Sequence, residues 1–132
     1  MRLHQLVGAM QPNAVILDPI TSFSTVGNLS EVKIMLTRVI DFLKGAGITA
    51  IFTGLTQGSD PAQLERTDED VSSLIDTWLL LHMANAAGRR HRLLYVLKSR
   101  GMAHSHQVRE LLLDDAGIDL IDASAEFGRL DG

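Results

Sequence analysis

Residues Ala14-Val-Ile-Leu-Asp18 and Ile48-Thr-Ala-Ile-Phe-Thr53 form two short apolar runs, one on each side of a helical pattern. Uninterrupted branched side chains are typical of strands that are buried on both faces of a parallel sheet. A strand, a helix and a strand with short connections predict a βαβ unit, with parallel strands and a right-handed crossover. The helix follows from apolar residues at the i, i+3, i+4 and i+7 spacing: Val32, Met35, Leu36, Val39, Ile40 and Leu43.

Local signals mark the ends of the helices in this first part. Ser30 is suited to be the N-cap of the central helix, with Glu31 in its first turn. Lys44 is expected in the last turn, just before two closely spaced glycines. The segment Arg2–Met10 predicts a further short helix that stops at the following Gln-Pro.

The composition indicates one globular domain and excludes several classes of protein. The chain has 132 residues, of which 45% are hydrophobic and 21% charged. A net charge of −4 gives no general attraction for nucleic acid or an anionic membrane. The absence of cysteine excludes a disulfide framework and a cysteine-ligated zinc site. No apolar run approaches the roughly 20 residues of a membrane span, so we expect a cytoplasmic protein with no membrane or nucleic-acid partner.

The second half of the sequence has the pattern of an antiparallel sheet. Residues 56–70 first form a polar stretch of the kind that makes functional or mobile loops. Asp114-Asp-Ala-Gly117 then separates two alternating runs and predicts a hairpin. The fold class is therefore α/β, a partial parallel sheet followed by an antiparallel β-meander, and we expect residues 123–132 to be a flexible tail. The predicted strands of the meander are Trp78–Met83, Arg92–Lys98, Val108–Leu113 and Ile118–Asp122.

The segment Arg92-Leu-Leu-Tyr-Val-Leu-Lys-Ser-Arg-Gly101 carries the strongest functional pattern. Alternate side chains share a face of a regular strand, so we expect Leu94, Val96, Lys98 and Arg100 on one side. Two cations roughly 6–7 Å apart suit a polyphosphate, which an ammonium and a guanidinium fork would hold together. The glycine then breaks the strand. The alternative is an exposed strand end that is basic for solubility.

Asp18 is a second candidate, because it follows the first strand of the βαβ unit. Open α/β sheets bind ligands at the carboxyl ends of their central strands. The alternative is that Asp18 caps the turn that begins at Pro19. His104-Ser-His106 forms only a weak metal pair, because no third ligand is near it in the sequence.

The order of these features resembles the KaiC branch of the RecA-like ATPases, over nearly the whole chain from about residue 2 to residue 122. Val15-Ile-Leu-Asp18-Pro resembles the Walker B strand, and Glu31–Lys44 the helix that follows it. The stretch Lys98-Ser-Arg-Gly-Met-Ala-His104 is similar to the Lys-x-Arg-Gly segment that reaches the ATP of the neighbouring subunit in a ring. Thr67–Thr77 resembles the segment that carries a phosphorylated Ser-Thr pair. Residues 1–122 would thus be the C-terminal part of an ATPase domain.

The resemblance implies a role for each matching residue. Asp18 would hold the magnesium-bound water, and Ser72 and Ser73 would be the phosphoacceptors of an autokinase. Lys98 and Arg100 would be the catalytic cations, since such groups neutralise the charge that develops in phosphoryl transfer. The implied ligands are ATP and magnesium. The residues implied to contact the nucleotide are Lys98, Ser99, Arg100, Met102, His104 and Asp115, the last near the base and ribose.

The sequence departs from the family in one major respect. It contains no G-x-x-x-x-G-K-[ST] motif, which supplies the backbone cradle for the phosphates. The paired glutamates that precede the Walker B strand in the family also have no counterpart. The chain therefore resembles the C-terminal half of one ATPase domain. We expect ATPase activity only in an intact ring, and none from this chain alone.

Two other functions fit the same residues. The chain would be a non-enzymatic interaction module that docks on RecA- or KaiC-like subunits and donates Lys98 and Arg100 in trans or caps the ring. Otherwise it would be a degenerate fragment without activity. Half of a RecA domain exposes a sheet edge and an apolar face. Each version therefore predicts a homo-oligomer or association with RecA- or KaiC-like subunits.

Overall fold

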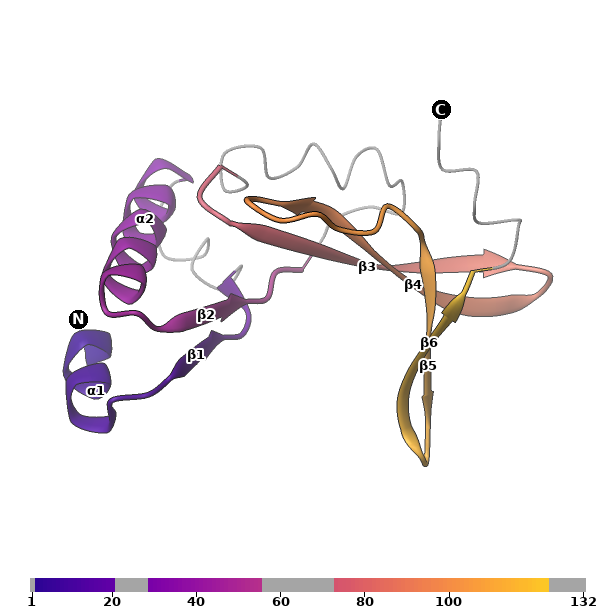
Figure 1. Cartoon of the computed structure of the whole chain (residues 1–132), viewed down its shortest axis with the longest axis horizontal. Coiled ribbons are helices and arrows are strands. Elements are labelled where there is room, and N and C mark those ends of the chain that lie inside the picture. The colour runs from indigo at the N-terminus through magenta and orange to yellow at the C-terminus, as the bar shows by residue number, and fades with distance from the viewer. Residues whose placement is uncertain (1, 21–28, 56–72, 124–132) are drawn as a thin grey trace. The chain divides into compact units, whose positions relative to one another are not determined.

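The computed structural model describes residues 2–20, 29–55 and 73–123 (Figure 1). The chain divides into two compact units, Met1–Thr56 and Gln57–Gly132. The first contains both helices and a parallel pair of strands, and the second contains an antiparallel sheet. This confirms the predicted α/β fold with a parallel sheet and an antiparallel meander. The predicted tail falls almost entirely outside the described residues, as does the polar stretch 56–70.

The first unit runs α1 (Arg2–Met10), β1 (Ala14–Leu17), α2 (Leu29–Gly45) and β2 (Thr49–Phe52). Strands β1 and β2 are parallel, with Ala14 opposite Thr49 and Leu17 opposite Phe52. This confirms the predicted parallel arrangement, and α1 has the predicted bounds. Neither helix in the described part of the chain has the length and apolar character needed to cross a bilayer.

The core of the first unit lies between the helices and one face of the two strands. Its buried members are Val7 from α1 with Val39 and Leu43 from α2. Apolar side chains of β1 and β2 pack against these three: Val15, Leu17, Ala50 and Phe52. Figure 1 shows both helices beside the strand pair, in agreement with this one-sided packing.

The expectation that the first strand is buried on both faces is wrong for this chain. Burial alternates along both strands, and the outer face carries Ile16, which is 63% exposed, opposite Ile51, which is 49% exposed. The apolar composition suits a strand covered twice, but the helices of the first unit cover it once. An apolar sheet face is therefore left uncovered in the first unit.

The ends of α2 differ slightly from the prediction. The helix begins at Leu29, so Ser30 lies inside its first turn and is not the N-cap. Glu31 and Lys44 occupy the first and last turns as predicted. At the C-terminus, the N–H of Gly47 donates to the carbonyl of Lys44 at 3.0 Å, and Gly47 has φ +69°. This left-handed residue ends the helix and directs the chain into β2.

The second unit is a four-stranded antiparallel sheet in the order β3-β4-β5-β6. The long β3–β4 hairpin is paired along its whole length, whereas β4 and β5 share only the pairs Leu93–Glu110 and Leu94–Arg109. Figure 1 shows the β5–β6 hairpin turning away from the long hairpin beyond this junction. The predicted meander is confirmed; β3, β4 and β6 are longer than expected, and β5 begins and ends one residue later than expected. Their bounds are β3 (Thr77–Ala86), β4 (Arg89–Ser99), β5 (Arg109–Asp114) and β6 (Gly117–Asp122).

The turn between β3 and β4 contains an alanine in a backbone conformation that disfavours it. Ala87 and Gly88 have φ values of +49° and +74°, which is the type I′ geometry favoured in two-residue hairpins. An alanine side chain is disfavoured at positive φ, whereas asparagine tolerates it. We predict that Ala87→Asn raises the unfolding free energy of the hairpin by about 1 kcal/mol, measured by hydrogen exchange of the β3 and β4 amides. A lower stability would contradict the assigned turn geometry.

Candidate nucleotide-binding strand end

The C-terminal end of β4 contains a bulge that changes the predicted faces. Trp78 pairs with Lys98 while Leu79 pairs with Val96, so β4 has one extra residue, Leu97, at this point. Cross-strand partners share a face, and Lys98 therefore lies on the side of Trp78, opposite to Val96. The expectation that Leu94, Val96, Lys98 and Arg100 share one side is wrong, because the extra residue interrupts the period of two.

Backbone pairing continues to the last residue before the glycine. The hydroxyl oxygens of Ser99 and Thr77 lie 3.2 Å apart, and the N–H of Arg100 donates to the carbonyl of Asp76 at 2.8 Å. Gly101 then takes φ +73°, and the chain bends away from the strand. The predicted break at Gly101 is confirmed. Lys98, Ser99 and Arg100 are thus held on paired backbone up to the point where the strand ends.

The surroundings of Lys98 lower its pKa below the ordinary value. Partial burial of the ammonium is the largest cause, followed by the neighbouring Arg100 guanidinium. The Asp76 carboxylate acts in the opposite direction and offsets part of the decrease. The two cations therefore repel each other in the folded chain, a condition that an anionic ligand would relieve. No sequence pattern pointed to Asp76, which lies opposite Arg100 across the strand pair.

We predict that the Lys98 pKa responds in opposite directions to two substitutions. Arg100→Gln removes a like charge and should raise it, whereas Asp76→Asn removes an opposite charge and should lower it further. The readout is carbon-detected NMR titration of the three lysines, with Lys33 and Lys44 as internal references. Because the unfolded chain binds this proton more tightly, the contribution of Lys98 to the free energy of unfolding increases as pH rises from the lowered pKa of the folded chain to the ordinary pKa of the unfolded chain. Shifts of the same sign in both variants would contradict this account.

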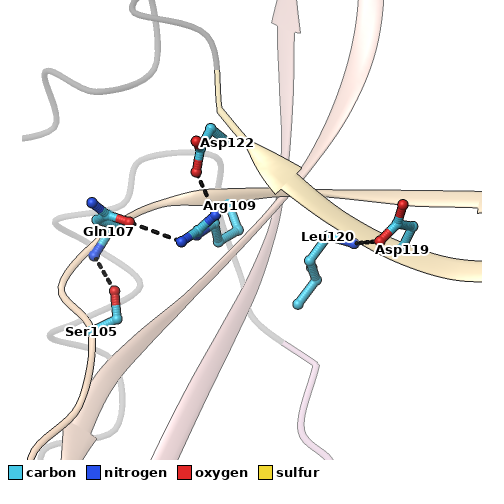
Figure 2. Close-up of polar contacts among 6 residues, drawn as sticks. All are labelled: Ser105, Gln107, Arg109, Asp119, Leu120 and Asp122. Carbon is cyan, nitrogen blue, oxygen red and sulfur yellow. Dashed lines mark hydrogen bonds and ion pairs between the residues drawn. The ribbon is translucent and has the colours of Figure 1, made fainter.

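The segment after Gly101 is tied to the sheet by a chain of polar contacts (Figure 2). The N–H of Gln107 donates to the Ser105 hydroxyl at 3.2 Å, and Arg109 Nη2 donates to Gln107 Oε1 at 3.0 Å. Arg109 also pairs with Asp122 of β6. These contacts begin directly after the stretch that carries Met102, which is exposed, and His104, which is half-buried. The ring centroids of His104 and His106 lie 4.7 Å apart.

Asp115 lies apart from Lys98 within the second unit. It occupies the exposed turn between β5 and β6, where Asp114 accepts the N–H of Ala116 at 2.8 Å. Leu94 is paired with Arg109, and the strands are antiparallel. Lys98 and Asp115 therefore lie on opposite sides of this pair along the direction of the strands. The structure gathers Lys98, Ser99 and Arg100 at one end of the pairing and places Asp115 at the other.

Asp18 stands directly after β1, at the carboxyl end of the parallel pair, as predicted. Thr53 stands directly after β2, and its hydroxyl donates to Asp18 Oδ1. Both residues are exposed. Thr53 was not among the predicted site residues, although a signal for it is present: residues that directly follow two paired parallel strands lie side by side.

The donor set at Asp18 fits magnesium through one carboxylate. The described residues contain no group of three or more potential metal-ligating side chains. Magnesium commonly keeps several waters and takes one or two carboxylates together with substrate phosphates.

Of the two predicted phosphoacceptors, Ser72 lies outside the described residues, and Ser73 is exposed in the turn that precedes β3.

Comparison with known proteins identifies the family. The model of the family described as "ATPase: KaiC" matches residues 1–125. The circadian clock protein KaiC2 of Synechocystis sp. is 47% identical over 129 residues, which cover 98% of this chain and 23% of that protein. The circadian clock oscillator protein KaiC of Synechococcus elongatus is 25% identical over 124 residues, 94% of this chain and 24% of that protein. The chain thus spans about a quarter of the length of these relatives, and it belongs to the KaiC ATPase family.

Proposed function

We propose that this chain supplies two sets of contacts to magnesium nucleotides in a KaiC-type ring. Lys98 and Arg100 contact the phosphates of a nucleotide on the neighbouring subunit, and Asp18 holds a metal-bound water at the chain's own nucleotide. The observation that carries this proposal is the end of β4, where backbone pairing holds two mutually repelling cations directly before a turn. Such a pair is suited to a polyphosphate, which neutralises both charges.

The placement of the other candidate residues fits contacts to two different nucleotides. Ser99, Met102 and His104 lie on or just after the strand end, so we assign them to the nucleotide reached by Lys98 and Arg100. Asp115 lies at the opposite end of the β4–β5 junction. We assign it to the base and ribose of another nucleotide. Ser72 and Ser73 are the proposed phosphoacceptors if the ring has autokinase activity.

Hydrolysis requires parts that this sequence does not contain. The chain has no G-x-x-x-x-G-K-[ST] motif, and that loop provides the backbone donors and the lysine for the β- and γ-phosphates. In phosphoryl transfer, Lys98 and Arg100 stabilise the charge that develops on the transferred group. We therefore propose phosphate binding for this chain and ATPase activity for the complete ring.

An NMR titration with Mg-ATP tests the proposed phosphate contact. Amide shifts are expected to concentrate at residues 98–104, with smaller shifts along the rest of β4. AMP, which lacks the β- and γ-phosphates, is the matched control and should shift these amides much less. Equal shifts with ATP and AMP, or shifts confined to other strands, would overturn the assignment of Lys98 and Arg100 to phosphate binding.

The uncovered apolar face of β1 and β2 favours a second candidate function, that of an interaction module. Ile16 and Ile51 lie opposite each other on this face and are both exposed. Apolar sheet surface of this kind drives association with another protein surface. In this version the chain docks on KaiC-like subunits without binding nucleotide by itself.

We predict that the isolated chain self-associates at micromolar concentration through this face. Ile16→Lys combined with Ile51→Lys should lower the molar mass in light scattering to that of a monomer. The matched control is Met10→Lys combined with Leu55→Lys, which adds the same charge at exposed apolar residues outside the strands. This control should leave the association unchanged. A compact monomer of the unsubstituted chain would contradict the prediction.

A further inference from the structure

The residue after β2 is fixed against the end of β1 by its own backbone. The N–H of Thr53 donates to the carbonyl of Leu17 at 3.0 Å, and the carbonyl of Thr53 accepts the N–H of Ile20 at 2.8 Å. These two bonds bracket Asp18 in the sequence. They depend on main-chain atoms alone, so we expect them to persist in Thr53→Val and Thr53→Ser, which keep the backbone N–H and carbonyl.

The side chain of Thr53 uses this fixed position to hold the carboxylate. Its hydroxyl donates to Asp18 Oδ1, and β-branching restricts the rotation of the threonine side chain. Within the described residues, Asp18 forms a side-chain bond only with Thr53. An exposed aspartate without such a partner would exchange between rotamers. The bond occupies one carboxylate oxygen and leaves the second for a ligand.

We infer that Thr53 is the positioning residue of Asp18: it holds the carboxylate in one orientation, in which the second oxygen would be available to a water bound to magnesium. Hydrogen bonds among the groups that surround a metal site fix their orientation and strengthen metal binding. The magnesium part of this inference rests on the proposed function of Asp18. The orientation of the Asp18 side chain does not, and it is measured separately.

The first experiment measures the Asp18 side-chain rotamer by three-bond NMR couplings in the isolated chain without metal. One rotamer is expected for the unsubstituted chain and for Thr53→Ser, which retains the hydroxyl. Thr53→Val keeps the shape and loses the donor, so its couplings should average over several rotamers. The control is Thr49→Val, the same change at the first residue of β2. A single rotamer in Thr53→Val would overturn the inference.

The second experiment uses Mn²⁺ alone as a probe for the magnesium site. Paramagnetic broadening is expected at the Ile20 amide in the unsubstituted chain and should disappear in Asp18→Asn. Thr53→Val should weaken the apparent Mn²⁺ affinity by roughly tenfold to a hundredfold, and Thr53→Ser should restore it. Broadening that persists in Asp18→Asn would overturn the metal role of Asp18, and with it that part of the proposed function. The rotamer measurement still decides the positioning role of Thr53 by itself.

Discussion

Replacing Leu43 with alanine is expected to destabilise the first unit by about 2–5 kcal/mol, the range for buried leucines. Leu43 is 0% exposed and packs in the cluster with Val7 and Val39. The loss should appear as faster hydrogen exchange of the α2, β1 and β2 amides, by roughly 30-fold to several thousand-fold where exchange requires the unit to open. The cost arises because the surrounding side chains cannot fill the cavity that the substitution leaves.

Ile34→Ala is the matched control for this result. Ile34 lies on the same helix, but it is 55% exposed, so its truncation removes little buried surface. We expect a change within about 1 kcal/mol, since alanine also has the better helix propensity. Equal effects of the two substitutions would contradict the assigned core.

Replacing both Lys98 and Arg100 with glutamine should abolish most of the affinity for Mg-ATP. Hydrogen bonds to charged groups contribute about 1.5–3 kcal/mol each, so two of them correspond to a loss of roughly 10²- to 10⁴-fold. Equilibrium dialysis with labelled ATP measures the change. Screening by salt should weaken binding to the unsubstituted chain.

Arg89→Gln combined with Arg90→Gln provides the control for net charge. These arginines are exposed at the opposite end of β4, so the control removes the same two charges from the same strand. Its affinity should stay within about threefold of the unsubstituted chain, since exposed charges beyond a Debye length of about 10 Å contribute little. A comparable loss in both double variants would show that binding depends on net charge and not on the strand end.

Periodicity was sufficient to predict most elements of the fold. The spacing from Val32 to Leu43 predicted α2, and Asp114-Asp-Ala-Gly117 predicted the β5–β6 hairpin. What it could not predict depends on tertiary context. Apolar runs such as Ala14–Leu17 indicate which faces of a strand are suited to burial. Which of these faces is covered depends on the elements that pack against the strand in the folded chain. Whether Ser30 is the N-cap depends on the residue at which the helix begins, and a single candidate cap residue does not determine that residue.

The candidate residues were proposed from the sequence, and their geometry could be seen only in the structure. A bulge such as that at Leu97 depends on strand pairing, and no local pattern marked it. For the same reason, the sequence did not reveal that Lys98 faces away from Val96. Asp76 and Thr53 could not be predicted from local patterns, because each interacts with a residue that is distant in sequence. Asp76 interacts electrostatically with Lys98, and Thr53 donates a hydrogen bond to Asp18. The parallel strand ends contained the signal for Thr53, since residues that follow paired strands are neighbours.

Calorimetric titration of the purified chain with Mg-ATP at modest salt tests the proposed nucleotide contact most directly. We predict binding of Mg-ATP in the micromolar range, with weaker binding of ADP and the weakest of AMP, because the proposed contacts are to phosphates. The absence of binding up to millimolar Mg-ATP would contradict it. Membership of the KaiC family would then reflect common ancestry and fold without nucleotide binding by this chain. The function as an interaction module, through the apolar face at Ile16 and Ile51, would then be favoured.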